Sequence, residues 1–282
     1  MDIQQENWQQ KLFPYAYNIL GSTEDAKDAI QDVLYNYLAA QKAVDDVKNY
    51  LIKSVINQSI NIKNKKKRLQ YGDIWLPEPV ATETADTDVN LKEIASYSLL
   101  ILMEALSPKE RAAFILKEAF GYSHQEISKV LDGTVENSRK LLSRAKTKLD
   151  SRRQSADARN MAPGTLDRFI DAIRGGDTKT LKNLLSEDIT FYADGGATVN
   201  VVAKMAAGYQ HVADLLVFIY HKYDKGLHIK RSEVNHQPAL LYFNGHHLVA
   251  AQVFGVSPES GKIFQIYNVL DPEKLKNYRA AE

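Results

Sequence analysis

Apolar residues recur every three or four positions over most of the first 150 residues, and this spacing predicts amphipathic α-helices. The pattern is strongly helical over 8–69, with one clear interruption at 21–25, and helices are again expected over 91–106 and 108–119. Ser107 is a start signal for the last of these, because a proline follows it and a glutamate comes three residues later. The first half of the chain is therefore predicted to be all α.

A short helix, a tight turn and a longer helix are predicted over 122–149. Ser123 caps the short helix, Asp132 and Gly133 break it, and Thr134 opens the longer one. The longer helix has one apolar face and one polar, mostly basic face, as in a helix-turn-helix whose second helix enters the major groove of DNA. A solvated two-helix hairpin is the alternative. The outer positions expected to face DNA are Thr134, Glu136, Asn137, Arg139, Lys140, Ser143 and Arg144.

The helix predicted over 47–68 changes from apolar to basic along its length. Amide side chains come just before the cations, and amides that read bases beside lysines that hold phosphates suit a nucleic-acid groove. A solvated helix end is the alternative. The side chains concerned are Asn57, Gln58, Asn61, Lys63, Lys65, Lys66, Lys67 and Arg68.

The helix predicted after residue 22 carries acids on its outer face, with a glutamine beside them. Such a face is usually only solvated, but it can also dock a basic surface of a partner. The outer residues are Asp25, Asp28, Gln31 and Asp32.

Two prolines within 72–79 forbid a helix there and favour an extended path that ends the first domain. Residues 80–90 are rich in Thr, Glu, Asp and Ala, which predicts a flexible acidic linker. Trp75 lies in this region and needs a pocket, which we expect on a neighbouring domain. A polar connector over 153–162 marks a second boundary.

The period of the apolar pattern changes in the last third of the chain. Helices are expected over 165–175, 178–185 and 208–223. Alternation with a period of two predicts strands over 189–193, 199–203, 227–234, 238–243, 247–256 and 263–269. Helices followed by a meander of strands indicate an α+β domain with one curved sheet wrapped on helices.

With 282 residues, of which 44% are hydrophobic, the chain is long enough for two or three domains. It has no apolar run that could span a membrane and no signal-like N-terminus, so we expect a soluble cytoplasmic protein. Cysteine is absent, which excludes disulfides and thiolate metal sites. The net charge is only +1, but basic residues cluster at 63–68 and 139–153, and a phosphate backbone meets the local charge.

The first half of the chain, over about 8–152, resembles an extracytoplasmic-function (ECF) sigma factor of the sigma-70 family. Residues 20–32 resemble the segment of region 2 that binds core RNA polymerase, and residues 106–111, 125–127 and 137–145 resemble region 4. The resemblance implies that Asp25, Asp28, Gln31 and Asp32 contact the polymerase. It also implies that the amides and cations between Asn57 and Arg68 face the promoter −10 element and that the helix from Thr134 faces the −35 element.

The segment Trp75-Leu76-Pro77-Glu78-Pro79 resembles the linker signature of the ECF subgroup that carries a SnoaL-like domain behind region 4. The strand pattern is similar to that nuclear-transport-factor-like cone fold. The subgroup's Asp-Gly-Gly-Gly-Lys turn here reads Asp194-Gly195-Gly196-Ala197-Thr198, and its closing Asn-Pro-Asp-Lys-Leu is matched only in part by 268–275. The regulatory contacts implied are Trp75, Pro77, Asp194, Gly195, Gly196, Asp271, Pro272, Lys274 and Leu275.

The expected segments are region 2 over 1–71, a linker over 72–90, region 4 over 91–152, a connector over 153–162 and a SnoaL-like regulatory domain over 163–282. The function implied is that of an alternative sigma factor that directs promoter-specific transcription initiation, with core RNA polymerase and promoter DNA as partners. The fused domain is expected to restrain the DNA-binding regions in place of a separate anti-sigma factor. A small ligand in that domain is left open.

A one-component repressor, with a metabolite in the C-terminal domain and an operator on the helix-turn-helix, is the alternative function. A SnoaL-like enzyme is the third, and it needs a buried general base. The candidates are Asp194, His211, His221, His236, His246 and His247. We expect no catalysis, because a lone histidine near apolar sequence is more often structural. No metal site or cofactor is expected, because no histidine spacing indicates one.

Overall fold

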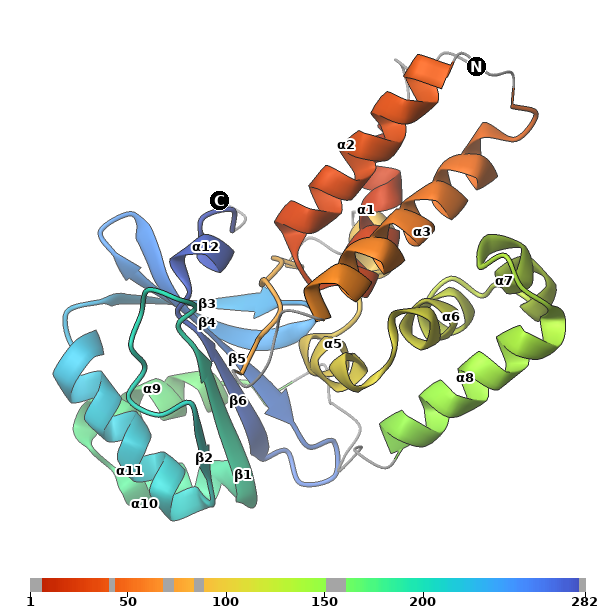
Figure 1. Ribbon diagram of the computed structural model, residues 1–282. Coiled ribbons are helices and arrows are strands. Elements are labelled where there is room, and N and C mark those ends of the chain that lie inside the picture. The colour runs from red at the N-terminus through yellow and green to blue at the C-terminus, as the bar shows by residue number, and fades with distance from the viewer. Residues whose placement is uncertain (1–6, 41–43, 68–73, 84–88, 151–160, 279–282) are drawn as a thin grey trace. The chain divides into compact units, whose positions relative to one another are not determined.

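The computed structural model describes residues 7–40, 44–67, 74–83, 89–150 and 161–278. The chain forms two compact units. The first comprises Met1–Asp73, Thr84–Ala95 and Leu99–Arg153, and the second comprises Ile74–Glu83, Ser96–Ser98 and Gln154–Glu282. The first unit is helical and the second contains the sheet (Figure 1). The predicted fold class, an all-α half followed by an α+β domain, is confirmed.

Three helices begin the first unit: α1 (Trp8–Leu20), α2 (Thr23–Ala40) and α3 (Val47–Lys67). Gly21 ends α1 in the left-handed conformation, with φ 73°, which glycine adopts without steric cost. A second break precedes α3, which begins at Val47 as the sequence predicts. There the Asp46 carboxylate accepts the backbone N–H of Asn49 at 3.0 Å and caps the helix.

The helix predicted over 91–106 is wrong as one element. The chain instead forms α4 (Val89–Lys92), α5 (Tyr97–Leu102) and a 3₁₀ turn, η1 (Met103–Ala105). The fully buried Asn18 explains the break, since its amide donates to the Glu93 carbonyl at 2.7 Å and accepts the Ala95 N–H at 2.8 Å. These tertiary hydrogen bonds use backbone groups that a continuous helix would pair internally.

The helix-turn-helix consists of α7 (His124–Val130) and α8 (Val135–Asp150), and α6 (Pro108–Glu118) packs against both; we call residues 103–150 the helix-turn-helix domain. Ser107 and Ser123 each form a capping box with the glutamate three residues later, as the sequence predicts. The inner face of α8 is apolar, as the sequence predicts, and Val135 in its first turn is half-buried. Its buried residues are Ser138, Leu141, Leu142, Ala145 and Leu149.

An ionic cluster holds α3 to α6 and η1. The Glu104 carboxylate accepts the ammonium of Lys63 at 2.9 Å and the guanidinium of Arg111, whose side chain is only 1% exposed. Lys63 also donates to the Leu20 carbonyl, and Arg111 donates to the Asn18 carbonyl. Burial lowers the pKa of Lys63 to about 8, with the Arg111 charge adding to the shift. Burial would raise the pKa of Glu104, but the two cations outweigh it and hold that pKa below its usual value.

The second unit is built on one six-stranded sheet in the order β2-β1-β6-β5-β4-β3. Only β1 and β6 pair in parallel; the other pairs are antiparallel. The strands are β1 (Leu185–Asp194), β2 (Met205–Ala207), β3 (His228–Val234), β4 (Gln237–Asn244), β5 (His247–Val256) and β6 (Ile263–Val269). The helices are α9 (Thr165–Gly175), α10 (Thr178–Leu184), α11 (Tyr209–Ile219), which continues as a π-helical turn, η2 (Tyr220–Asp224), and α12 (Pro272–Leu275).

Helices α9, α10 and α11 cover one face of this sheet (Figure 1). Phe169 of α9 packs edge-on against Phe254 of β5, with ring centroids 5.1 Å apart, at the centre of the apolar core. The strand predicted over 199–203 is wrong: the described chain there is irregular, and the edge strand is the shorter β2. No helix among the described residues is both long and apolar enough to cross a bilayer.

We predict that Glu104→Gln lowers the stability of the first unit by about 3–5 kcal/mol, because it leaves two buried cations facing each other without a counter-charge. Chemical denaturation followed by circular dichroism measures this. Glu118→Gln is the matched control, since Glu118 pairs with Lys146 at the surface and its removal is expected to cost less than about 1 kcal/mol. Equal losses in the two variants would contradict the prediction.

Candidate nucleic-acid interface and linker-binding surface

The outer face of α8 presents a row of exposed polar side chains. All seven predicted residues, Thr134, Glu136, Asn137, Arg139, Lys140, Ser143 and Arg144, are exposed. The Thr134 hydroxyl accepts the backbone N–H of Asn137 at 3.0 Å, which fixes the start of the helix. Lys140 pairs with Glu136 at 2.6 Å, and both side chains are more than two-thirds exposed. A strongly exposed ion pair is weak, so Lys140 is held only loosely by its partner.

Four of the eight nucleic-acid residues predicted over Asn57 to Arg68 are engaged within the first unit. The Asn57 amide donates to the Val130 carbonyl and Gln58 donates to Asp32 at 3.2 Å. Lys66 donates to both oxygens of Asp25, at 2.6 and 2.8 Å. Lys63 lies in the Glu104 cluster rather than on the outer face. Asp25 and Asp32, which are predicted to bind polymerase, therefore contact α3 side chains that are predicted to bind DNA.

The other residues of α2 and α3 that are predicted to bind polymerase or DNA are either exposed or outside the described residues. Asn61, Lys65, Asp28 and Gln31 are exposed. The side chain of Lys67 and the whole of Arg68 lie outside the described residues.

Sequence reasoning missed four charged residues that join α3 to the helix-turn-helix domain: Lys53, Glu104, Arg111 and Asp132. Arg111 was the detectable one, since it directly precedes the apolar run 112–116 of α6, and a cation at such a position needs a buried acceptor. The partner of Lys53 has no local signal, because Asp132 lies 79 residues further along the chain.

In the second unit, the carboxylate of Asp194 is the acceptor on which three segments converge. Its Oδ2 accepts the backbone N–H of Leu76 at 2.7 Å and the ammonium of Lys274 at 2.5 Å. Its Oδ1 accepts the N–H of Gly196 at 2.9 Å. Lys274 also donates to the Leu76 carbonyl at 2.7 Å and lies 4.7 Å above the ring centre of Trp75. Asp194 thus binds Leu76 both directly and through Lys274.

The turn after Asp194 needs glycine at two positions. A Cβ on Gly195 would lie 2.1 Å from the Val199 carbonyl oxygen, and one on Gly196 would lie 2.4 Å from the Asp271 carboxylate. Gly196 also has φ 61°. Asp271 caps α12, where Pro272 is the first residue and Leu275 is buried, so this close approach positions the helix that carries Lys274.

Residues 80–83 are predicted as part of a flexible linker, but in the structure they are hydrogen-bonded to the β3–β4 hairpin. Val80 exchanges two hydrogen bonds with Asn235, both at 2.9 Å. The Thr82 N–H donates to the Glu233 carbonyl at 3.1 Å, and the Thr82 hydroxyl accepts the His236 N–H at 2.7 Å. Asn235 and His236 have φ of 48° and 60°, the two-residue turn that asparagine favours. The sequence of 80–83 carries no pattern that identifies this partner.

These contacts lie on the sheet face opposite the apolar core. Tyr192 and Asp194 alternate along β1 with Phe191 and Ala193, which belong to the core, so they point the other way. On the same face, Tyr97 donates to the Pro77 carbonyl at 2.7 Å and packs on Tyr267, with centroids 5.6 Å apart. Residues 74–83 and 96–98 therefore form an integral layer of the second unit.

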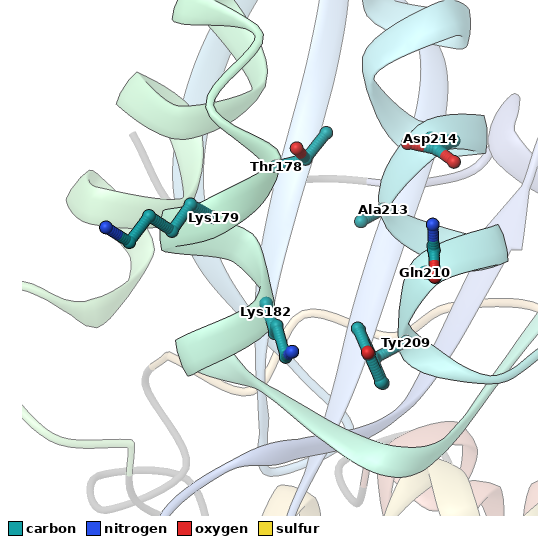
Figure 2. A pocket seen from close by; sticks show the side chains of 7 residues that line it. All are labelled: Thr178, Lys179, Lys182, Tyr209, Gln210, Ala213 and Asp214. Carbon is teal, nitrogen blue, oxygen red and sulfur yellow. The ribbon is translucent and has the colours of Figure 1, made fainter.

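Four of the five candidate histidines of this unit, His211, His221, His246 and His247, are exposed; His236 is buried. Among the described residues, no group of histidine and acidic side chains is arranged to hold a metal ion. A shallow pocket of about 260 Å³ lies between α10 and α11 (Figure 2). Lys182 lies 4.7 Å above the Tyr209 ring there, whereas Lys179 points away from α11 (Figure 2). No buried polar side chain points into this pocket to orient a ligand.

A family model for sigma-70 region 4 matches residues 98–149, which include the helix-turn-helix. The chain is 25% identical over 285 residues to an ECF RNA polymerase sigma factor of Mycobacterium tuberculosis, SigJ, with 96% of this chain and 91% of that protein covered. A probable ECF RNA polymerase sigma factor of the same organism, SigI, is 27% identical over 283 residues, with coverage of 95% and 92%. The crystal structure of SigJ matches with a TM-score of 0.76 at 23% identity, over 97% of this chain and 98% of that one. Together these matches support an alternative sigma factor, similar over nearly its whole length to ECF sigma factors.

The match to SigJ extends through the sheet domain, so the α+β domain that the sequence predicts to be SnoaL-like is part of the matched fold. These relatives are named as sigma factors, and nothing in the comparisons favours the one-component regulator. The roles of individual residues in binding polymerase and DNA, and in regulation through the linker, stay predictions.

We predict that Lys274→Met frees the linker from the SnoaL-like domain. The substitution removes the ammonium that donates to the Leu76 carbonyl and pairs with the Asp194 carboxylate. Hydrogen exchange followed by mass spectrometry should show the Leu76 amide exchanging at least about tenfold faster, since breaking a buried pair costs roughly 3–5 kcal/mol.

Lys276→Met is the matched control, because Lys276 lies just past α12 and pairs with Glu273 at the surface. It should leave the Leu76 amide protected. The prediction fails if the two variants exchange alike at this amide.

Proposed function

We propose that this sigma factor binds core RNA polymerase through the outer face of α2 and contacts promoter DNA with α3 and α8. The observation that carries this proposal is the outer face of α8. Seven polar side chains are exposed there on a helix that the Thr134 hydroxyl caps and whose buried inner face packs against α6 and α7. Arg139 and Lys140 can reach phosphates or guanine edges from such a helix.

The acidic face of α2 supports polymerase binding. Asp28, Gln31 and Asp32 are exposed on one helix, beside the half-buried Asp25. Acids so placed suit a basic surface on a large partner, since complementary charge steers association and fixes orientation. Polymerase binding also implies that the protein works in the cytoplasm.

We infer that the SnoaL-like domain regulates initiation by binding the linker between regions 2 and 4. Region 2 is assigned to 1–71, region 4 to 91–152 and the regulatory domain to 163–282, and residues 74–83 are bound by this last domain. A linker that is hydrogen-bonded at Leu76, Val80 and Thr82 cannot extend freely between two separated DNA sites. A fused domain that controls the linker would remove the need for a separate anti-sigma factor.

The same geometry argues against catalysis in this domain. Asp194, a candidate base, is 5% exposed and already accepts two N–H groups and an ammonium, so it has little capacity left to take a substrate proton. The geometry does not favour a regulatory ligand either, since the pocket in Figure 2 is open and lined mostly by exposed side chains.

Run-off transcription with purified core polymerase tests the function. Templates are first selected from random-sequence DNA by the holoenzyme, and the parent protein should support initiation from them. Absence of initiation and of any complex with core polymerase would refute the proposal.

We predict that Arg139→Ala weakens holoenzyme binding to the selected promoter about tenfold and flattens the dependence of log affinity on log salt concentration by roughly one unit. Lys225→Ala, an exposed lysine of the SnoaL-like domain, removes the same charge and should leave both quantities unchanged. Equal effects of the two variants would show that only net charge matters.

A further inference from the structure

A polar pair joins the two helices of the helix-turn-helix. The ring nitrogen Nδ1 of His124, the first residue of α7, lies 2.9 Å from the hydroxyl oxygen of Ser138 on α8. Ser138 is only 2% exposed, and His124 is half-buried. Either tautomer of the ring can form this hydrogen bond, because a hydroxyl both donates and accepts. The contact therefore does not depend on which ring nitrogen carries the proton.

Ser138 lies on the inner face of α8, directly between two residues of the outer face. Asn137 precedes it and Arg139 follows it, and both are exposed and predicted to face DNA. Successive residues of a helix are about 100° apart around its axis, so the direction of the Ser138 side chain fixes the directions of both neighbours. A rotation of α8 about its axis would therefore move Asn137 and Arg139 together.

The apolar contacts of this inner face set the rotation of α8 less sharply. Leu141, Leu142 and Ala145 are buried there, and apolar burial is non-directional. A hydrogen bond is directional, since it weakens steeply as its angle departs from linear. Ser138 keeps its orientation because a buried hydroxyl without a partner is costly.

His124 stands at an anchored end of α7. Beside it, the Ser123 hydroxyl accepts the Glu126 N–H at 3.2 Å, and the Glu126 carboxylate accepts the Ser123 N–H at 2.7 Å. One residue earlier, the Tyr122 N–H donates to the Leu116 carbonyl of α6 at 2.9 Å. The imidazole is therefore held in place by the connection between α6 and α7.

We propose that His124 is a positioning residue for promoter recognition. Its hydrogen bond to Ser138 sets the rotation of α8 and so decides which base edges Asn137 and Arg139 reach. His124 acts through Ser138 rather than through a contact of its own with DNA. The inference rests on the proposed function, in which the outer face of α8 contacts the −35 DNA.

Without His124, the Ser138 hydroxyl has an alternative partner in its own helix. The Ser138 N–H donates to the Thr134 carbonyl at 3.0 Å, and a serine hydroxyl can also bond the carbonyl four residues earlier. That local bond satisfies the hydroxyl but leaves it unconnected to α7. We therefore expect loss of His124 to change promoter recognition more than the stability of the fold.

Two amide substitutions test the geometry. In His124→Asn the amide oxygen and nitrogen stand two bonds beyond Cβ, as Nδ1 does, so the contact with Ser138 is kept. In His124→Gln they lie one bond further and miss it. Discrimination is the ratio of holoenzyme affinities for the selected promoter and for the same DNA with a scrambled −35 element. His124→Gln should bind the selected promoter about tenfold more weakly, as for one lost base contact, and the scrambled DNA as the parent does.

Serine substitutions provide the matched comparison. Ser138→Ala removes the other half of the contact and should lose discrimination as His124→Gln does, with no further loss in the double variant. Ser128 of α7 is also buried, but its hydroxyl donates to the Gln125 carbonyl of its own helix at 2.7 Å. Ser128→Ala should therefore leave discrimination unchanged.

Equal losses on the selected and scrambled DNA would show that His124 only stabilises the domain, and would overturn the proposal. It would also be overturned if His124→Asn were as weak as His124→Gln, or if His124→Gln discriminated as the parent does. All affinities are measured below the lowest unfolding midpoint found by circular dichroism, so that folded proteins are compared. The sigma-factor function is tested separately, by initiation with the unmodified parent, so its failure is distinguishable from failure of this inference.

Discussion

Burial of the Asp194–Lys274 pair is the constraint on which the second unit depends. Both side chains are at most 10% exposed, so each charge must be satisfied by fixed partners rather than by water. Those partners are the Leu76 backbone, the turn at Gly196 and the short helix that Asp271 caps. A sheet that could face solvent instead carries a layer of chain from the sequence between the two DNA-binding regions. The ion pair makes this distant segment part of the domain.

Asp194 also shows why a fold does not fix a function. An acid at the end of a strand in a SnoaL-like domain looks like a catalytic base, and the sequence alone leaves that reading open. The Asp194 carboxylate instead accepts hydrogen bonds from Leu76 of the linker and from Lys274, on the sheet face opposite the apolar core. The same carboxylate that would bind a substrate in an enzyme here binds a backbone amide.

Local signals carried most of the sequence predictions that the structure confirms. Capping boxes at Ser107 and Ser123, glycine turns and the change of period near residue 185 all depend on neighbours in the chain, so they place α6, α7 and most of the strands. What the sequence hides are partners far along the chain. Asn18 breaks a predicted helix from 75 residues away, Thr82 meets Glu233 across 151 residues, and Lys63 leaves the outer face of α3 for Glu104.

These long-range contacts share a physical pattern. Cations and amides that sequence reasoning assigns to DNA, such as Lys63 and Asn57, are satisfied by acids and carbonyls of the protein itself. A basic or amide-rich helix end costs energy when it is buried without acceptors, so a free protein supplies them internally. A cation that can bind a DNA phosphate can also bind a carboxylate of the protein, because both partners are anions. The exposed side chains on the outer face of α8 can therefore contact a partner directly. Lys63 and Asn57 can do so only after their hydrogen bonds within the protein break.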